Sequence, residues 1–168
     1  LSRCVGDSLV VEYGNDPVNI ERIQINEFIS AILKAYSLKL DKNGIKLEFE
    51  SDGEFYVWFD LMQLEEVFIN MLSNAINHCE NEKNINVNIK KVDKYVKISV
   101  FNTGKHIPES DLKRIWEKFY KVDKARTREY GGNGIGLSIV KAILDNFEAR
   151  FGVENKENGV EFWFMLEV

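Results

Sequence analysis

The chain has 168 residues, 45% of them hydrophobic, which is enough for one compact domain with a buried core and too short for two of ordinary size. The formal net charge is -5, and lysines and arginines are scattered along the chain, so no nucleic-acid partner is expected. Cys4 and Cys79 lie far apart without metal-ligand spacing, which argues against a disulfide framework or a zinc site and fits a reducing cytosol.

No apolar run approaches the ~20 residues needed to cross a bilayer, and no signal peptide opens the sequence, so we expect no membrane contact from this piece. The chain starts with Leu1 and not with Met, which suggests a longer parent with room for a membrane anchor. Residues 1–18 contain Gly6, Gly14 and Pro17 with little periodicity. They predict the end of an upstream helix followed by a linker, with the domain itself over residues 19–168.

In chain order, apolar residues at helical spacing first predict an amphipathic helix over residues 24–40, which Lys42-Asn43-Gly44 ends. Alternation then predicts strands over residues 45–50 and 55–59, joined as a hairpin at Asp52-Gly53. Each pattern is typical of an element with one buried and one exposed face.

Asp60 is well placed as the N-cap of a second helix that runs to about His78. Residues 85–90 and 96–100 alternate on either side of the turn at Asp93-Lys94, which predicts a second hairpin. The second helix is therefore expected to lie between two strand pairs.

A polar, glycine-bearing stretch over residues 102–136 follows, with only a short helical piece around residues 112–116. A third helix is predicted over residues 135–147, and strands over residues 150–154 and 160–168 close the chain, joined by a short turn. Strands in hairpins and helices in separate blocks predict an α+β layer sandwich and not a doubly wound sheet. The long irregular stretch is where a lid or binding loop is expected.

The second predicted helix carries Asn70, Asn74 and Asn77 at spacings that place them on one stripe. Asparagine is a mediocre helix former, so its repetition on one face needs an explanation. Amide oxygens can coordinate a hard cation such as Mg2+ while the amide nitrogens donate to phosphate. A solvated face that happens to be rich in asparagine is the alternative.

Two glycine-bearing motifs bound the irregular stretch. Asn102 and Gly104 follow a predicted strand, where a polar side chain can contact a base edge and a glycine lets a ligand approach the backbone. An ordinary turn would have the same composition. Residues 131–137, Gly-Gly-Asn-Gly-Ile-Gly-Leu, open the third helix and favour a phosphate site, although the spacing is not that of a P-loop or a dinucleotide fingerprint. The alternative, a flexible linker, would not continue directly into an apolar helical pattern.

Between these motifs the loop combines aromatic residues with cations, which could close over a nucleotide with the ring against the base and the charges on phosphate. The candidates are Phe119, Tyr120, Lys121 and Arg126. For the neighbouring Lys124 and Arg128, a solvated charge run is an equal alternative.

The order of these motifs resembles the catalytic and ATP-binding domain of sensor histidine kinases, in the wider family that includes the ATPase domains of gyrase, the ninety-kilodalton heat-shock chaperone and MutL. Residues 68–78 look like the N box, 102–108 like the G1 box, 114–120 like the F box and 132–137 like the G2 box. The resemblance covers residues 19–168, and Leu1-Ser2-Arg3 is similar to the end of the dimerisation helix that precedes this module.

The resemblance implies a Bergerat fold, a two-layer α/β sandwich in which a mixed five-stranded sheet lies under three main helices beside an ATP lid. It implies ATP and Mg2+ as ligands, with Asn74 and Asn70 at the metal. Carried over by position, the nucleotide site would include these two and Asn77, His78, Asn102, Gly104, Ile107, Phe119, Tyr120, Lys121, Arg126, Gly132, Gly134, Ile135, Gly136 and Leu137.

Two residues depart from the family pattern, since Asn102 stands where Asp is usual and His106 where a second glycine is usual. An Asn oxygen can still accept a hydrogen bond from the adenine amino group, but without the carboxylate's charge the bond should be weaker. A degenerate module of the pseudo-kinase kind, or an anti-sigma-like protein-binding domain, is therefore the alternative reading.

Within the family, the hydrolytic branch has a Glu where this chain has Asn70, and Asn cannot activate water; Glu66 is the only nearby carboxylate. The expected activity is therefore that of a protein-histidine kinase, with a purely hydrolytic ATPase as a third hypothesis. It would transfer the γ-phosphate of Mg-ATP to a histidine on the adjoining dimerisation domain in a two-component phosphorelay.

The acceptor histidine is expected to be absent from this chain, because His78 and His106 both fall inside nucleotide-binding motifs. The partners would be the dimerisation and histidine phosphotransfer domain of the same protein and a cognate response regulator. The resemblance implies a cytoplasmic domain of a sensor protein whose parent is anchored in the cell membrane.

Overall fold

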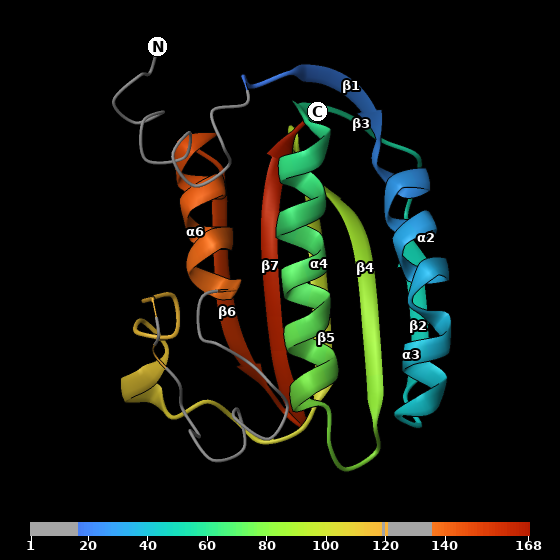
Figure 1. Ribbon diagram of the computed structural model, residues 1–168, viewed down its shortest axis with the longest axis vertical. Helices are drawn as coiled ribbons and strands as arrows, with labels where there is room; N and C mark the ends of the chain where they lie inside the picture. Colours follow the sequence, from blue (N-terminus) through green and yellow to red (C-terminus); the bar gives the residue numbers. More distant parts are fainter. Residues whose placement is uncertain (1–16, 119, 121–135) are drawn as a thin grey trace.

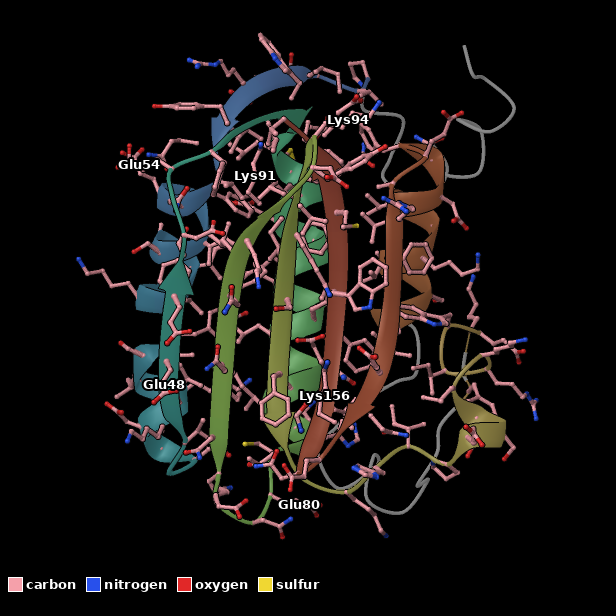
Figure 2. All side chains as sticks on the ribbon, turned by 180° about the vertical axis from the view of Figure 1, so that it is seen from behind. Glu48, Glu54, Glu80, Lys91, Lys94 and Lys156 are labelled. Carbon is pink, nitrogen blue, oxygen red and sulfur yellow. The ribbon has the colours of Figure 1, made fainter. Side chains whose placement is uncertain are left out.

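The computed structural model describes residues 17–118, 120 and 136–168. Within this part, the main feature is a sheet of five strands in the order β2-β4-β5-β7-β6, with the helices on one face (Figure 1). The other face carries no helix of the described chain and is seen directly from behind (Figure 2). The two layers confirm the α+β sandwich predicted from the sequence.

The sheet is mixed, as the resemblance implied. The strand β2 pairs with β4 in parallel, and every other neighbouring pair is antiparallel. The predicted hairpins β4–β5 and β6–β7 are both confirmed. The strand bounds are β2 Lys46–Ser51, β4 Asn84–Val92, β5 Tyr95–Thr103, β6 Arg150–Lys156 and β7 Gly159–Glu167.

Alternation along the strands decides which face is buried. In β4, Ile85, Val87 and Ile89 are fully buried, while Asn86 and Asn88 point to the open face of the sheet. Successive side chains of a strand point to opposite faces, so this pattern fixes the register as well as the orientation of the strand.

Four helices of the described chain cover the other face: α2 Ile25–Ala35, α3 Ser37–Lys42, α4 Leu61–His78 and α6 Gly136–Asn146. The longest, α4, lies across the middle of the sheet beside α6 (Figure 1). Its predicted N-cap is confirmed, because the Asp60 carboxylate accepts a hydrogen bond from the Gln63 N–H at 3.1 Å. Its apolar stripe, from Leu64 to Ile76, is buried against the sheet.

The predicted hairpin over residues 45–59 is wrong. The strand β3, Tyr56–Asp60, pairs instead with β1, Ile20–Gln24, in a separate sheet of two strands. The sequence pattern did not predict β1. The cause is Asn26, whose amide bonds Ser51 Oγ (2.7 Å), Gly53 O (2.7 Å) and the Phe55 N–H (3.0 Å). These bonds hold the connection against the start of α2, so the chain leaves the sheet where a tight turn was expected.

Two helical predictions also need correction. The single helix predicted over residues 24–40 is two helices, interrupted at Tyr36, whose N–H is shared between the carbonyl oxygens of Ile32 (3.0 Å) and Leu33 (3.2 Å). Apolar spacing does not reveal the interruption because Leu40, beyond it, is still buried in the same core. In place of a helical piece at residues 112–116, a 3-10 helix η1 at Glu109–Asp111 is followed by turns.

Phe59 and Trp58, which are neighbours on β3, give a matched test of the register in which β3 pairs with β1. Phe59 is 2% exposed and stacks on Phe147 at 4.0 Å, whereas Trp58 is 66% exposed on the opposite face. Phe59→Ala should lower the free energy of unfolding by about 3–5 kcal/mol, and Trp58→Ala by about 0.5 kcal/mol or less, measured by urea denaturation. Equal losses, or the larger loss at Trp58, would show that β3 is placed in the wrong register.

Candidate functional site

The asparagine stripe of α4 reaches the beginning of α6. Asn70, Asn74, Asn77 and His78 are all half-buried on α4. The Asn70 Nδ2 donates to the Glu66 carbonyl oxygen at 2.7 Å, which turns the amide oxygen away from its own helix. A Cβ added at Gly136 would lie 2.9 Å from that oxygen, so Gly136 and Asn70 are in close contact despite their separation in sequence.

This contact brings the first and last predicted motifs to one place. Gly136 is the first residue of α6, and the N–H groups of a helix's first turn carry partial positive charge and lack intrahelical acceptors. Leu137, next to it, is half-buried against the core. The Asn70 amide oxygen and the N-terminus of α6 therefore lie side by side, where a cation and an anion could be bound together. The candidates Gly132, Gly134 and Ile135 lie outside the described residues.

The end of β5 is tied to the C-terminal end of α4. Thr103 Oγ1 donates to the Glu80 carbonyl oxygen at 2.7 Å and accepts from the Asn84 N–H at 3.0 Å. The Glu80 N–H in turn donates to the Thr103 carbonyl oxygen at 2.9 Å. The last residue of the strand is thus fixed from both sides by the segment that follows the helix, and its neighbour Asn102 is fixed with it.

Asn102 is 3% exposed, and its Nδ2 donates to the carbonyl oxygens of His78 (3.3 Å) and Thr103 (3.0 Å). A Cβ at Gly104 would lie 2.7 Å from the same His78 oxygen, and Gly104 has φ +148°, so this position suits glycine alone. The structure therefore brings Asn102 and Gly104 together at the backbone carbonyl of His78.

The loop after Gly104 is held by a residue that sequence reasoning missed. Asn155, on β6, accepts from the Ile107 N–H at 2.9 Å and donates through Nδ2 to the Ile107 carbonyl oxygen at 2.8 Å. The His106 ring bonds the Lys156 carbonyl oxygen beside it. A single Asn in a strand has no motif around it, so no local signal in the sequence could have identified Asn155.

Tyr120 is the described member of the predicted lid residues. Its hydroxyl donates to the Asp111 carboxylate, and this hydrogen bond raises the pKa of the Tyr120 phenol. The Arg114 guanidinium lies over the ring, 4.5 Å from its centroid. Tyr120 is thus tied to the segment that precedes it. The candidates Phe119, Lys121 and Arg126 lie outside the described residues.

Cys79 follows α4 directly and is 4% exposed. Burial raises the pKa of its thiol above the ordinary value, while its hydrogen bond with Thr103 acts in the opposite direction. A thiol with a raised pKa stays protonated at neutral pH and is a poor nucleophile. We therefore assign Cys79 to packing and not to chemistry.

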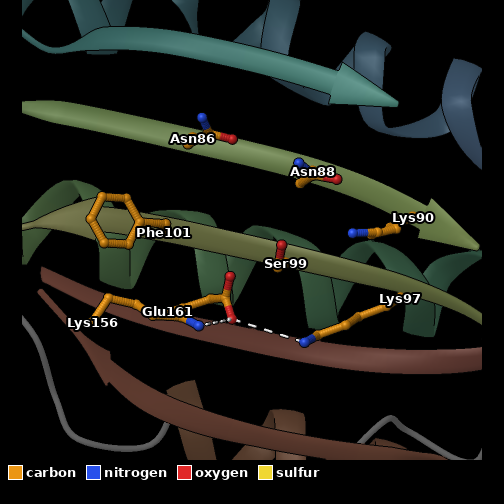
Figure 3. A pocket seen from close by; sticks show the side chains of 8 residues that line it. All are labelled: Asn86, Asn88, Lys90, Lys97, Ser99, Phe101, Lys156 and Glu161. Carbon is orange, nitrogen blue, oxygen red and sulfur yellow. Dashed lines mark ion pairs between the residues drawn. The ribbon is translucent and has the colours of Figure 1, made fainter. Parts of the chain in front are cut away.

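A hollow of about 430 Å³ lies on the open face of the sheet (Figure 3). Glu161 in its floor pairs with Lys97 at 4.0 Å and Lys156 at 3.8 Å, and the nearby Glu154 and Glu161 raise the pKa of the Lys156 ammonium. Its lining is Asn86, Asn88, Lys90, Lys97, Ser99, Phe101, Lys156 and Glu161. This hollow is separated from the asparagine stripe by the sheet itself.

The comparison with known families agrees with this geometry. The family described as histidine kinase-, DNA gyrase B-, and HSP90-like ATPase matches residues 59–168, well over half of the chain. The chain belongs to this family, as a domain of the histidine kinase catalytic type.

Among individual relatives, the sensor histidine kinase WalK of Bacillus subtilis (strain 168) is 31% identical over 128 residues, 75% of this chain and 21% of that protein. The sensor protein kinase WalK of Staphylococcus aureus is 30% identical over 145 residues, 85% of this chain and 35% of that protein. The chain therefore spans about a fifth to a third of these relatives. None of the described helices is long and apolar enough to cross a membrane.

Solved structures are similar over most of the chain. The catalytic domain of histidine kinase ThkA has a TM-score of 0.80 and 28% identity, covering 89% of this chain and 96% of that one. ThkA in complex with the response regulator protein TrrA has a TM-score of 0.78 and 27% identity, covering 98% of this chain and 46% of that one. These matches confirm the fold class and the recognition made from the sequence motifs.

Asn155 gives a prediction for the loop at Ile107. Asn155→Ala removes both hydrogen bonds, so the free energy of unfolding should fall by about 1–3 kcal/mol and the Ile107 amide should lose protection from hydrogen exchange. Both are measurable on the isolated domain. Asn88→Ala is the control, because its amide makes only a 3.5 Å contact with Glu50 at the surface, and should change stability by about 0.5 kcal/mol or less. Unchanged exchange at Ile107 would contradict the assigned role.

Proposed function

We propose that this domain binds Mg-ATP and transfers its γ-phosphate to a histidine on an adjoining dimerisation domain in two-component signal transduction. The observation that carries the proposal is the close contact between Asn70 and Gly136. It joins an amide stripe suited to a cation with the N-terminus of a helix suited to phosphate. Membership of the ATPase family supports ATP as the ligand.

The residues at this contact fit a magnesium ion. The Asn70 amide nitrogen donates to the Glu66 carbonyl oxygen, so the Asn70 amide oxygen faces Gly136. An oxygen is the atom that a hard cation requires. Asn74, one turn along α4, is half-buried and accessible to the same ligand. Asn74 and Asn70 would hold the ion, which would neutralise charge on the phosphates when bound.

The base would lie against the end of β5. Asn102 would face the adenine amino group, while Gly104 and Ile107 would shape the pocket. Asn155 would keep Ile107 in place through its two hydrogen bonds. Asn77, His78 and Leu137 would border the sugar and phosphates, and Lys121 and Arg126 would act from the lid. The rigid wall and the phosphate end would then hold the nucleotide in one orientation.

Phosphoryl transfer needs little covalent help from the protein, so positioning and charge neutralisation would supply most of the rate acceleration. Asn70 lacks the carboxylate that a hydrolytic enzyme would use to activate water, which favours transfer over hydrolysis. The γ-phosphate would be exposed to an incoming histidine. His106 is bonded to the Lys156 carbonyl oxygen and His78 belongs to the pocket wall, so neither is suited to be that acceptor.

The acceptor would belong to a dimerisation and phosphotransfer domain preceding residues 19–168, with residues 1–18 as the end of its helix and the linker. A response regulator would be the second partner, an assignment supported by the ThkA complex with TrrA. We place the domain in the cytoplasm, with its parent anchored in the cell membrane. Sensor kinases of the WalK kind are the relatives that support this context.

Nucleotide binding is tested first by calorimetric titration of Mg-ATP into the domain. Asn74→Ala should weaken binding by roughly tenfold or more, because it removes a ligand of the ion, and EDTA should weaken binding of the unmodified domain similarly. Asn86→Ala, on the open face of the sheet, is the matched control and should bind as the unmodified domain does. Absence of any binding at millimolar nucleotide would overturn the proposal in favour of a degenerate, protein-binding module.

Transfer is tested by adding a separately purified histidine phosphotransfer domain from a WalK-type kinase together with Mg-ATP. Acid-labile, histidine-linked phosphate should accumulate on the added domain, and the catalytic domain alone should show little phosphorylation. Free phosphate released faster than the acceptor is labelled would instead indicate a hydrolytic ATPase.

A further inference from the structure

The hollow on the open face of the sheet has Ser99 as its floor, the smallest of the side chains that line it (Figure 3). In the register of the sheet, Ser99 lies opposite Asn88 of β4 on one side and Trp163 of β7 on the other. The Trp163 ring packs over Gly152, where an added Cβ would lie 2.8 Å from it, so the ring is directed toward β6 and not over Ser99. The resulting hollow of about 430 Å³ is within the size range of small-molecule sites.

The Ser99 hydroxyl points into this hollow (Figure 3). Ser99 is 6% exposed, and no side chain or backbone group of the described residues makes a hydrogen bond with its Oγ. A buried hydroxyl without a partner is unfavourable. A ligand in the hollow would supply that partner.

Two lysines lie directly opposite each other at one end of the hollow. Lys90 of β4 and Lys97 of β5 are cross-strand partners, and like charges in this position repel each other. Lys97 has Glu161 nearby, at 4.0 Å, whereas Lys90 makes no ion pair with any described residue. Figure 3 shows both side chains extending toward Ser99. A negative charge between the two ammonium groups would turn this repulsion into attraction.

The third lysine of the lining already has its counter-charges. The Lys156 Nζ lies 3.2 Å from the Glu154 carboxylate and 3.8 Å from the Glu161 carboxylate. Glu161 is therefore shared between Lys156 and Lys97. The positive charge that remains unbalanced lies at the end of the hollow where Lys90 and Lys97 meet.

An aromatic ring borders the other end of the hollow. Phe101 follows Ser99 by two residues on β5, so the two side chains share a face of the sheet and are about 7 Å apart along the strand. The Phe101 ring packs over Gly159, where an added Cβ would lie 2.8 Å from the ring. This packing fixes the ring at the end away from Lys90 and Lys97 (Figure 3).

We propose that this hollow binds a small organic anion, with its carboxylate or phosphate head group between Lys90 and Lys97. The Ser99 hydroxyl donates to the head group, and a planar apolar body lies against the Phe101 ring. Charge-assisted hydrogen bonds give the site its preference for an anion, and the ring gives it a preference for an apolar body over a bare ion. The site is independent of the proposed function, because the sheet separates it from the asparagine stripe.

Binding is tested by NMR titration of benzoate into the isotope-labelled chain at constant ionic strength. Benzoate should shift the backbone amide of Ser99 and the side-chain amides of Asn86 and Asn88, with a Kd on the order of 1 mM. Benzamide has the same shape without the charge, and acetate has the charge without the ring. Each should bind at least about fivefold more weakly than benzoate.

Substitutions separate this site from a general attraction of anions. Lys90→Gln should weaken benzoate binding at least about fivefold, because it removes one ammonium group from the head-group end. Ser99→Val should weaken it at least as much, because it fills the floor and removes the hydroxyl. Lys91→Gln is the matched control, since it makes the same charge change at the next residue, which does not line the hollow. It should bind benzoate as the unmodified chain does.

Several results would overturn the inference. These are equal binding of benzoate and benzamide, equal losses in Lys90→Gln and Lys91→Gln, or no shift at Asn86 and Asn88 with about 20 mM benzoate. Shifts at Asn70 and Asn74 in their place would locate the anion at the start of α6 and would also overturn it. Phenyl phosphate distinguishes the head groups: a preference for either anion over benzamide at this face supports the site, and the tighter of the two identifies the head group.

Discussion

The fixed junction between the end of β5 and the C-terminal end of α4 is the constraint on which the candidate site depends. Thr103 bonds Glu80 through both its side chain and its carbonyl oxygen, and the Asn84 N–H donates to the same hydroxyl. These bonds satisfy the backbone N–H and C=O of Glu80 and the N–H of Asn84, in the segment that follows α4. They also join the helix that carries the asparagine stripe to the strand that carries Asn102.

The second wall is built on this junction by packing. Helix α6 lies beside α4 on the same face of the sheet, and buries Val140, Ile143 and Leu144 (Figure 1). Its first residue meets Asn70 because a glycine leaves room for the amide oxygen. The position of the N-terminus of α6 relative to the end of β5 is thus set by ordinary core contacts, which are stiff because protein interiors are close-packed.

Much of this fold could be predicted from local patterns in the sequence. Alternation in β4, the Asp60 cap and the apolar face of α4 each predicted an element correctly because the information lies within a few residues. The partner of β2 could not be predicted, since Asp52-Gly53 favours a tight turn locally and the bonds from distant Asn26 override it. The role of Asn155 could not be predicted for the same reason, because it depends on a contact with a residue 48 positions away. The motifs predicted which residues form the candidate site, whereas the hydrogen bonds of the Asn102 amide to the carbonyl oxygens of His78 and Thr103 depend on the folded backbone around it.

Within the part of the chain that the structure describes, β2 and β6 are the two edges of the sheet. An edge strand presents unpaired N–H and C=O groups that can recruit a strand from another molecule. Both edge strands carry exposed charged residues: Lys46, Glu48 and Glu50 on β2, and Arg150, Glu154 and Lys156 on β6. Figure 2 labels Glu48 and Lys156 among them. Extension of the sheet from one copy of the domain into the next would bring these charged side chains close to those of the neighbouring strand. Charged residues on an edge strand are one of the means by which proteins disfavour strand pairing between molecules, and both edge strands of this domain carry them.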